Sequence, residues 1–225
     1  MTKLGELREE LRTVFSGRGA KLTDSLVPVL VFLVTNPLVG LRFALWGALG
    51  IAGVIALVRI RQKESLMYAL GGLGGVLLAA GFAWLSGSDT GFFLPGLISG
   101  AATVTLCVVS VLVRRPLAAW SSFITRRWPL EWYWHPRVLP AYVEVTIFWA
   151  VAFAARLALE YWFFSQESFV ALGVSRVGLG WPYTIALLVV SYLYGIWRLG
   201  KLEGPSVEEF KLGQEPPWVG QKRGF

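Results

Sequence analysis

Cysteine, histidine and charged residues are all scarce in this chain of 225 residues. Cys107 is the single cysteine and His135 the single histidine. One cysteine excludes an intrachain disulfide and a thiolate metal cluster, and His135 has no partner at a metal-ligand spacing. No HExxH, GxSxG, CxxC or paired-carboxylate motif lies in the apolar stretches. We therefore expect no metal and no cofactor, and the absence of motifs argues mildly against an enzyme.

Charge is low overall and is missing from long stretches of the chain. Only 16% of the residues are charged and 55% are hydrophobic, whereas soluble domains carry about 25% charged residues. Because the deficit is confined to long apolar runs, the composition predicts a polytopic membrane protein. We expect no cleavable signal peptide, since Met1–Ala20 carries charges throughout and has no apolar core.

The apolar runs predict an all-α polytopic membrane protein with six transmembrane helices. About 20 apolar residues in a helix cross the ~30 Å hydrocarbon core. We expect a membrane domain at 22–199, preceded by a cytoplasmic amphipathic helix within 1–21 and followed by a cytoplasmic tail, 200–225, that is extended or loosely ordered. The approximate spans are 24–38, 42–58, 66–85, 92–113, 141–164 and 181–199.

The two central runs are joined by a short polar turn and are rich in small residues. Gly71 and Gly75 share one helical face in the first run, as do Gly96 and Gly100 in the second. A bare backbone lets another helix approach closely. We therefore expect residues 66–113 to form a helical hairpin around which the other membrane helices pack.

Basic residues are distributed unevenly among the predicted loops. Eighteen of the 21 Lys and Arg residues fall in the N-terminal segment, the second and fourth loops and the tail with Arg198. Arg42 and Arg176 lie on the other side, and Arg156 lies within a span. Under the positive-inside rule this asymmetry predicts that both termini are cytoplasmic.

The longest predicted loop, Arg114–Pro140, alternates basic and aromatic residues. Such a loop can bind single-stranded nucleic acid by stacking, but Trp and Tyr also collect at lipid headgroups and Arg faces an anionic leaflet. The second interpretation is favoured, with His135 as an interface residue and no nucleic-acid partner. In the tail, Trp218 and Phe225 are apolar exceptions that are suited to docking.

Polar groups inside a membrane are costly, so each needs an explanation. Arg156 and Glu160 are four residues apart in the predicted fifth span, a spacing that favours an ion pair. The pair either locks this helix to its neighbours or lines a cavity for an anionic headgroup, a substrate or a proton. The structural role has more weight, because pairing satisfies both charges without a ligand. Glu144, nearer the cytoplasmic end, is expected to snorkel or to cap backbone.

Two further polar residues flank the outer side of the predicted membrane domain. Asp89 precedes the fourth span and is expected to cap it, because a single carboxylate is a poor cation site. Arg176 lies in the predicted outer loop Ser165–Gly180. Both are ligand or ion-pair candidates together with Arg156, Glu160 and Glu144.

Several stretches in one order resemble an uncharacterised bacterial integral membrane family, a domain of unknown function common in actinobacteria. The family is distantly similar to the intracellular septation protein A group. The resemblance covers roughly Asp24 to Leu199 and implies a multi-pass inner-membrane protein, with Arg156 and Arg176 matching the polar pattern and no catalytic residue to carry over. It rests on Asp24–Pro28, Arg59–Arg61, Gly91–Gly96, Ser110–Leu117, Phe153–Arg156, Leu172–Arg176 and Gly180–Pro182.

Together these patterns predict a structural or accessory component of the inner membrane. We expect its partners to be the lipid bilayer and other membrane proteins or further copies of itself. The alternative is a small-solute or ion transporter or channel with a polar site at Arg156 and Glu160. An intramembrane enzyme acting on lipid ranks third.

Overall fold

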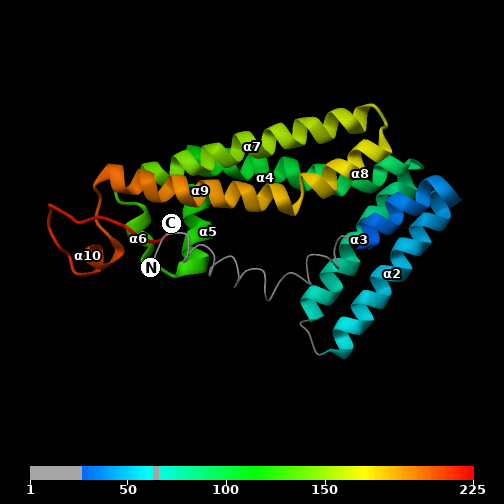
Figure 1. Ribbon diagram of the computed structural model, residues 1–225, viewed down its shortest axis with the longest axis horizontal. Coiled ribbons are helices and arrows are strands. Elements are labelled where there is room, and N and C mark those ends of the chain that lie inside the picture. Colours follow the sequence, from blue (N-terminus) through cyan, green and yellow to red (C-terminus); the bar gives the residue numbers. More distant parts are fainter. Residues whose placement is uncertain (1–26, 63–65) are drawn as a thin grey trace. The chain divides into compact units, whose positions relative to one another are not determined.

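The computed structural model describes residues 27–62 and 66–225, with side chains described for 27–62 and 73–225, and the described chain is built from helices joined by turns (Figure 1). The predicted amphipathic segment 1–21 and the predicted packing residue Gly71 lie outside these limits. A first helix covers Val27–Val39. The following elements are α2 (Leu41–Arg61), α3 (Leu66–Ser86), the 3-10 helix η1 (Asp89–Phe93), α4 (Leu94–Leu112), α5 (Leu117–Arg126), α6 (Leu130–Tyr133), α7 (Leu139–Ser165), α8 (Phe169–Gly178), α9 (Trp181–Leu202) and α10 (Val207–Lys211).

Four segments of the described chain are long and apolar enough to cross a membrane: Leu41–Arg61, Asp89–Leu112, Leu139–Ser165 and Phe169–Leu202. The prediction of six spans is therefore wrong for the described residues. Val27–Val39 and the part of α3 with described side chains, Leu73–Ser86, are shorter apolar helices. The predicted outer loop after α7 is also largely helical, because α8 continues the apolar pattern into α9.

The chain divides into two compact units, and the division does not follow the predicted hairpin. Unit 1 contains residues up to Gly96 together with Trp162–Trp181, and unit 2 contains Leu97–Tyr161 together with Pro182–Phe225. The boundary falls inside α4, α7 and α9. The predicted hairpin 66–113 is therefore not one packing unit: α3 belongs to unit 1 and nearly all of α4 to unit 2.

Unit 1 is held by alanines and phenylalanines. The buried face of α2 repeats alanine every four residues, at Ala44, Ala48, Ala52 and Ala56, and it packs against α3. The described buried residues of α3 are Val76, Ala79, Ala80 and Ala83. Figure 1 shows α2 and α3 side by side. Alanine has a small side chain and the best helix propensity, so these stripes allow a close approach without weakening either helix.

A phenylalanine cluster closes the end of unit 1. The Phe32 ring is fully buried and stacks on Phe92 with 4.2 Å between the ring centroids. Phe169 of α8 meets Phe32 edge-on at 5.4 Å and lies 5.8 Å from Phe93. The cluster therefore joins the first helix, η1 and α8, three elements that are far apart in the sequence.

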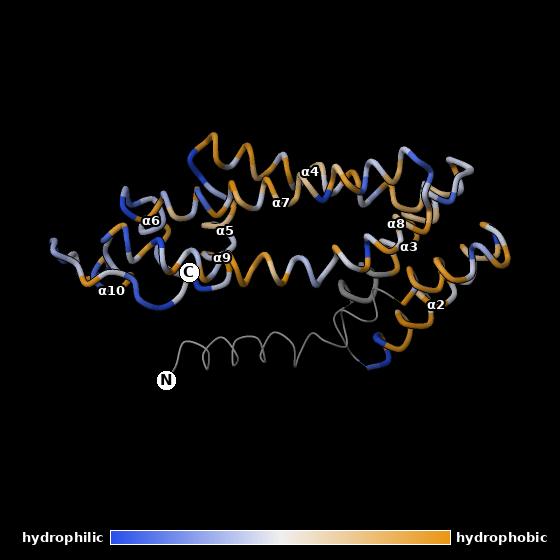
Figure 2. Tube along the Cα trace, turned by 45° about the horizontal axis from the view of Figure 1, so that its top comes forward, coloured by the Kyte–Doolittle hydropathy of each residue, from blue (hydrophilic) through white to orange (hydrophobic). Residues whose placement is uncertain are grey.

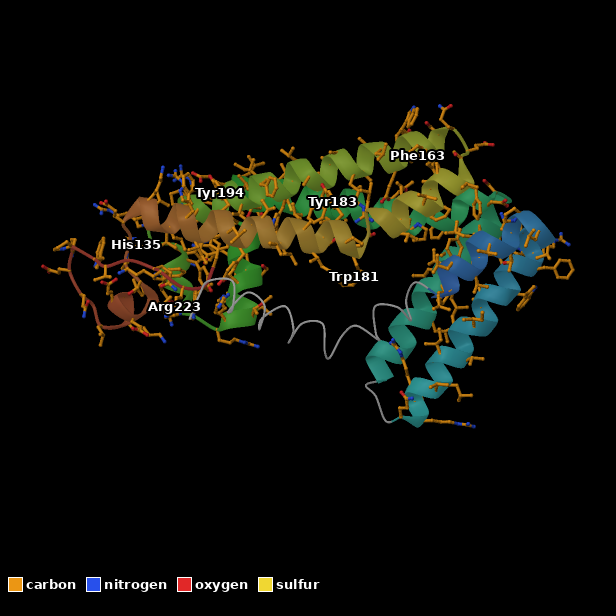
Figure 3. All side chains as sticks on the ribbon, viewed as in Figure 1. His135, Phe163, Trp181, Tyr183, Tyr194 and Arg223 are labelled. Atoms are coloured by element: carbon orange, nitrogen blue, oxygen red, sulfur yellow. The ribbon has the colours of Figure 1, made fainter. Side chains whose placement is uncertain are left out.

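In unit 2, α4, α7 and α9 lie side by side (Figure 1). Trp149 Nε1 of α7 donates a 2.7 Å hydrogen bond to the Ser191 hydroxyl of α9. Further along, the Tyr183 hydroxyl donates a 2.8 Å bond to the Ala152 carbonyl. Figure 3 labels Tyr183 near the start of α9 and Tyr194 towards its other end. Directional bonds thus fix the two long helices at two levels.

The predicted loop Arg114–Pro140 contains two helices, α5 and α6, and supplies much of the core of unit 2. Thr146 Oγ1 of α7 accepts the backbone N–H of Ala118, one of the amide groups that the start of α5 leaves without a helical partner. Trp132 and Tyr133 of α6 are fully buried. The aromatic residues of this segment therefore build a core as well as facing an interface.

The tail is folded, so the expectation of a loosely ordered segment is wrong. Ser206 and Glu209 form a capping box at the start of α10. Trp132 Nε1 donates a 2.9 Å hydrogen bond to the Pro205 carbonyl. At the far end, the Phe225 ring stacks on Tyr142 at 4.3 Å between centroids, in a space that Gly195 leaves open. Figure 2 shows hydrophobic residues dominating α2, whereas the tail around α10 includes strongly hydrophilic stretches.

Candidate functional site

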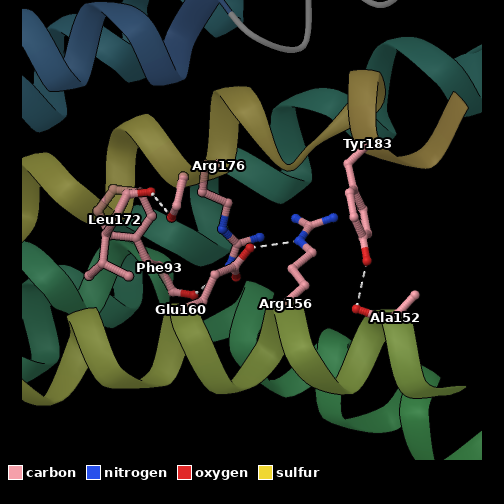
Figure 4. Close-up of polar contacts among 8 residues, drawn as sticks. Phe93, Ala152, Arg156, Glu160, Leu172, Arg176 and Tyr183 are labelled. Atoms are coloured by element: carbon pink, nitrogen blue, oxygen red, sulfur yellow. Dashed lines mark hydrogen bonds and ion pairs between the residues drawn. The ribbon is translucent and has the colours of Figure 1, made fainter. Parts of the chain in front are cut away.

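Arg156 and Glu160 form the ion pair that their spacing predicts. Both residues lie on α7 of unit 2, with Arg156 Nε 2.8 Å from Glu160 Oε1 (Figure 4). Glu160 is buried, with 3% of its surface exposed. A buried carboxylate is stable only when a cation or hydrogen bonds compensate it. The pair therefore satisfies a charge inside a helix that is long and apolar enough to cross a membrane.

Glu144 bonds to Arg198 and not to backbone, so the expectation of a backbone cap is wrong, whereas snorkelling stays a prediction. Arg198 donates to both carboxylate oxygens, from Nε to Oε2 and from Nη2 to Oε1, each at 2.7 Å. The Tyr194 hydroxyl donates a third bond at 2.7 Å. The side chains of Glu144 and Arg198 are each about one-third exposed. This two-pronged geometry ties the start of α7 to the end of α9.

The roles of Arg198 and Tyr194 as partners of Glu144 were not predicted from the sequence. The available signal was position: Glu144 lies near the start of one predicted span, and Arg198 lies near the end of the next. Consecutive antiparallel helices bring such positions to the same level. A search for opposite charges at matching depths would have found the pair.

Arg176 lies on a helix and not in a loop, since α8 covers Phe169–Gly178. Within unit 1 its Nη2 donates a 3.1 Å hydrogen bond to the Phe93 carbonyl (Figure 4). A Cβ placed on Gly96 would overlap the Arg176 guanidinium. Gly96 therefore makes room for an arginine, whereas the sequence predicted that it admits another helix.

Asp89 does not cap the fourth span. Its carboxylate accepts a short hydrogen bond from the amide of buried Asn36. The residue before η1 is Ser88, which makes no side-chain capping bond. Asp89 therefore ties the first helix of unit 1 to η1. The prediction failed because it considered only local partners, and Asn36 is 53 positions away in the chain.

The predicted packing glycines have different surroundings. In unit 2, a Cβ on Gly100 would lie 3.3 Å from Leu157 Cδ1, so α4 and α7 approach closely there. In unit 1, a Cβ on Gly75 would meet no described atom within 4 Å. The contact between α2 and α3 is made by alanines instead, and any packing role of Gly75 stays a prediction.

His135 belongs to the aromatic end of unit 2. Its ring meets Trp218 edge-on at 5.4 Å and lies 6.4 Å from Phe210, both residues of the tail. Burial and, to a lesser degree, the positive charge of Arg137 lower the pKa of His135 below its usual value. The imidazole is therefore neutral at pH 7, and its Nδ1 accepts the Arg137 backbone N–H at 3.2 Å. Figure 3 shows His135 near the tail.

The tail contains a carboxylate, Glu209, that is held by several backbone N–H groups. Glu209 accepts backbone N–H groups from Ser206 at 2.8 Å, Val219 at 2.6 Å and Gly220 at 3.2 Å. These donors lower the pKa of Glu209 to about 2. The carboxylate therefore organises the turn of the tail. The residues around it line a groove of about 620 Å³ that includes Trp128, Lys211 and Lys222.

Chemically, these arrangements hold helices and segments together. The carboxylates of Glu144, Glu160 and Glu209 are each engaged by specific donors. Within residues 27–62 and 66–225, the side chains that are described include no group of three or more His, Cys, Asp or Glu residues placed to hold a metal ion. Cys107 is fully buried in the core of unit 2.

The sequence from residue 17 to residue 196 matches a family described as a protein of unknown function, DUF3159. The match covers most of the chain, including every element from the first helix to most of α9. No curated protein matches this sequence, and no solved structure matches it.

Proposed function

This chain belongs to the DUF3159 family, and we propose that it serves a membrane as a structural or accessory component that packs with other membrane proteins. The observation that carries the proposal is a bare face of α3. Gly74, Leu78, Gly81 and Leu85 recur along the side of α3 opposite its buried residues. A Cβ on Gly74 or Gly81 would meet no described atom within 4 Å, and Leu78 and Leu85 are 62% and 85% exposed.

The alternation of glycine and leucine on this face favours packing against another helix over contact with lipid alone. Lipid tails solvate leucine as well as another helix does, so exposed leucines need no partner in a membrane. Glycine in a helix is about 1 kcal/mol less favourable than alanine. Gly74 and Gly81 therefore lower the stability of α3, and no described residue packs closely against them. A partner helix packed closely on this face would offset the lost stability.

The polar groups support the same proposal. Arg156 pairs with Glu160, and Arg198 pairs with Glu144. The Arg198–Glu144 pair joins α9 to α7 without a transported ligand, whereas Arg156 and Glu160 compensate each other within α7. Transport through a site at Arg156 and Glu160 is the weaker alternative, because the two residues compensate each other's charge without a ligand.

The location we propose is a bacterial inner membrane, with both ends of this chain on the cytoplasmic side. Two of the four candidate spans, Leu139–Ser165 and Phe169–Leu202, lie between the α4–α7 connection and the tail. The connection and the tail are therefore on the same side of the membrane. That connection contains five arginines, from Arg114 to Arg137, whereas the short connection between α7 and α8 contains Glu167 and no Lys or Arg. For these two connections the asymmetry supports the orientation under the positive-inside rule, whereas Arg59 and Arg61 at the end of α2 fall on the opposite side of a four-span arrangement.

Position-specific cross-linking in the native membrane tests the packing proposal. In a Cys107→Ala background, Gly81→Cys places a thiol on the bare face, and the matched control Ala80→Cys places one on the buried face beside it. We expect cross-linked membrane protein, or a second copy of the chain, from position 81 only, and loss of the product when Gly74→Leu is added. A chain that extracts alone, with no cross-link at position 81, would contradict the proposal.

A further inference from the structure

One surface of unit 2 combines exposed apolar side chains with arginines in an unusual backbone setting. It consists of α5 and the residues at its two ends, and we call it the α5 patch: Arg114, Arg115, Trp120, Ile124 and Arg127. The patch follows directly on α4, because the membrane-capable segment Asp89–Leu112 ends two residues before Arg114.

The helix α5 is amphipathic, and its outward side is not purely polar. Ala118, Ala119 and Ser122 are buried against unit 2. On the opposite side, Ile124 is 64% exposed and Trp120 is 37% exposed. These two residues are four positions apart and therefore share a face. A helix with an apolar outer stripe at the end of a membrane span fits a position in the headgroup layer.

Arg114 and Arg127 occupy backbone conformations that favour glycine. Their φ angles are +55° and +57°, in the left-handed region. Arg127 is the C-terminal cap of α5, the position around which glycine commonly ends a helix. The left-handed conformation is strained for a residue with a Cβ. Backbone geometry therefore favours glycine at both positions, and the two exposed arginines are held there with some backbone strain.

Arg115 is held in place by an aromatic ring. Its guanidinium carbon lies 4.2 Å from the centre of the Trp134 ring, and Trp134 in turn packs 6.0 Å from Trp120. Arg115 remains exposed to the outside. Stacking on tryptophan restricts a long side chain without using its N–H donors in an ion pair. The three arginines therefore present positive charge from both ends of one exposed helix.

We propose that the α5 patch binds the phosphate headgroups of anionic lipids in the leaflet where α4 ends. Guanidinium groups match phosphate oxygens with paired N–H donors, tryptophan prefers the headgroup level, and Ile124 reaches the acyl boundary. The patch contains no acidic residue between Arg114 and Trp128. This inference concerns a lipid site on unit 2 and is independent of the packing face on α3.

A single-stranded nucleic acid is the other polyanion that basic and aromatic residues bind. It needs open ring faces for stacking, whereas Trp120 packs edge-on against Phe123 at 6.0 Å and also contacts Trp134. The patch also adjoins the end of a membrane span. A lipid headgroup is therefore the favoured occupant, and nucleic acid becomes an outcome of the test.

The left-handed positions allow a test that separates lipid binding from folding. In Arg114→Gly/Arg127→Gly, relief of backbone strain should raise the melting temperature of the full chain in detergent, while loss of two cations should weaken phosphatidylglycerol binding at least tenfold. Binding is measured by native mass spectrometry and by the rise in melting temperature with added lipid, with phosphatidylcholine as the neutral comparison. Wild type should retain phosphatidylglycerol in preference to phosphatidylcholine.

Two control variants isolate the two effects. Glu203→Gly removes a left-handed non-glycine residue elsewhere in unit 2, where φ is +49°; it should raise the melting temperature and keep the lipid response. Lys211→Gln/Lys222→Gln removes the same charge from exposed tail positions and should also keep it. An unchanged phosphatidylglycerol response in the double glycine variant would overturn the proposal. So would displacement of the lipid by millimolar inorganic phosphate, or tight binding of a single-stranded oligonucleotide that the double variant loses.

Discussion

The cores of the two units use different chemistry. In unit 1, the buried side chains are mainly alanine and phenylalanine, which have no hydrogen-bonding groups. In unit 2, the core contains Trp132, Tyr133, Tyr142 and Trp149. A buried indole N–H or phenol must find a partner or it destabilises the fold. Trp149 donates to Ser191, Trp132 donates to the Pro205 carbonyl and Tyr133 shares a hydrogen bond with Ser122, whereas the buried Tyr142 hydroxyl has no hydrogen-bond partner among the described residues.

The difference shows why the tail belongs to the core of unit 2. The Trp132 indole donates its hydrogen bond to the Pro205 carbonyl, and the Phe225 ring stacks on the Tyr142 ring. Arg126 Nε also donates a 3.0 Å bond to the Phe225 carbonyl. Unit 1 depends on contact area and close approach, whereas unit 2 depends on directional bonds that polar segments outside the spans supply. Mutations should therefore act through lost volume in unit 1 and through lost partners in unit 2.

The largest expected effect is in unit 1. Phe32→Ala removes a fully buried ring from the phenylalanine cluster and should lower the free energy of unfolding by about 3–5 kcal/mol. Thermal unfolding in detergent measures the loss. Val34→Ala, on the same helix but 62% exposed, should change stability by less than about 0.5 kcal/mol. Equal effects of the two substitutions would mean that the cluster is not the core of unit 1.

The next effect concerns the contact between Phe225 of the tail and Gly195 of α9 in unit 2. Leucine at Gly195 would overlap the Phe225 ring, and overpacking of this kind costs about 1–3 kcal/mol. We expect Gly195→Leu to release the tail, seen as faster proteolysis after Gly204. The matched control is Gly200→Leu on the same helix, where a Cβ meets nothing described within 4 Å. Similar proteolysis of both variants would show that Phe225 does not anchor the tail.

Trp132→Phe tests the buried hydrogen bond of unit 2, together with the loss of part of the buried ring volume. Trp132→Phe keeps an aromatic ring but leaves the buried Pro205 carbonyl without its indole donor. An unsatisfied buried group costs about 1–3 kcal/mol, so the variant should melt at a lower temperature. Trp46→Phe on α2 should have little effect, because Trp46 is 66% exposed. A neutral result at Trp132 would remove the main contrast between the two cores.

The smallest effect is a pH dependence confined to the tail. Hydrogen bonds lower the pKa of folded Glu209 to about 2 from an ordinary value of 4.5. A lowered carboxyl pKa stabilises the folded tail above pH 4.5, and this contribution is lost as pH falls from 4.5 towards 2. Protection of the Val219 amide, measured as its hydrogen-exchange rate relative to that of the unfolded chain at the same pH, should fall over that window. Glu209→Gln should abolish the window and exchange faster at neutral pH, whereas exposed Glu208→Gln should retain it.

The pattern of apolar residues predicted the class of the protein and several of its helices. Long runs with few charges indicate membrane-capable helices, and α2, α4, α7 and α9 all lie close to predicted spans. The ion pair of Arg156 and Glu160 was also predictable, because a helix alone places residues four apart beside each other. These features depend on local periodicity and composition, which are properties of the sequence itself.

Other features depend on partners that are distant in the sequence. The acceptor role of Asp89 requires Asn36, the bonds of Glu144 require Arg198, and the ring of Phe225 requires Gly195. The number of membrane-capable helices also differed from the prediction, because Val27–Val39 and the described part of α3, Leu73–Ser86, are shorter apolar helices. The alanine faces of α2 and α3, which pack in unit 1, were also not predicted.

The sequence by itself therefore determined that the chain is helical, that it is apolar enough for a membrane and that its basic residues gather in particular segments. Only the tertiary structure decided which charges pair across helices, which glycines face a neighbour and that the polar tail folds onto unit 2. The physical reason is that helix formation depends on residues within four positions. Burial and hydrogen bonding depend instead on whichever segments the fold brings together.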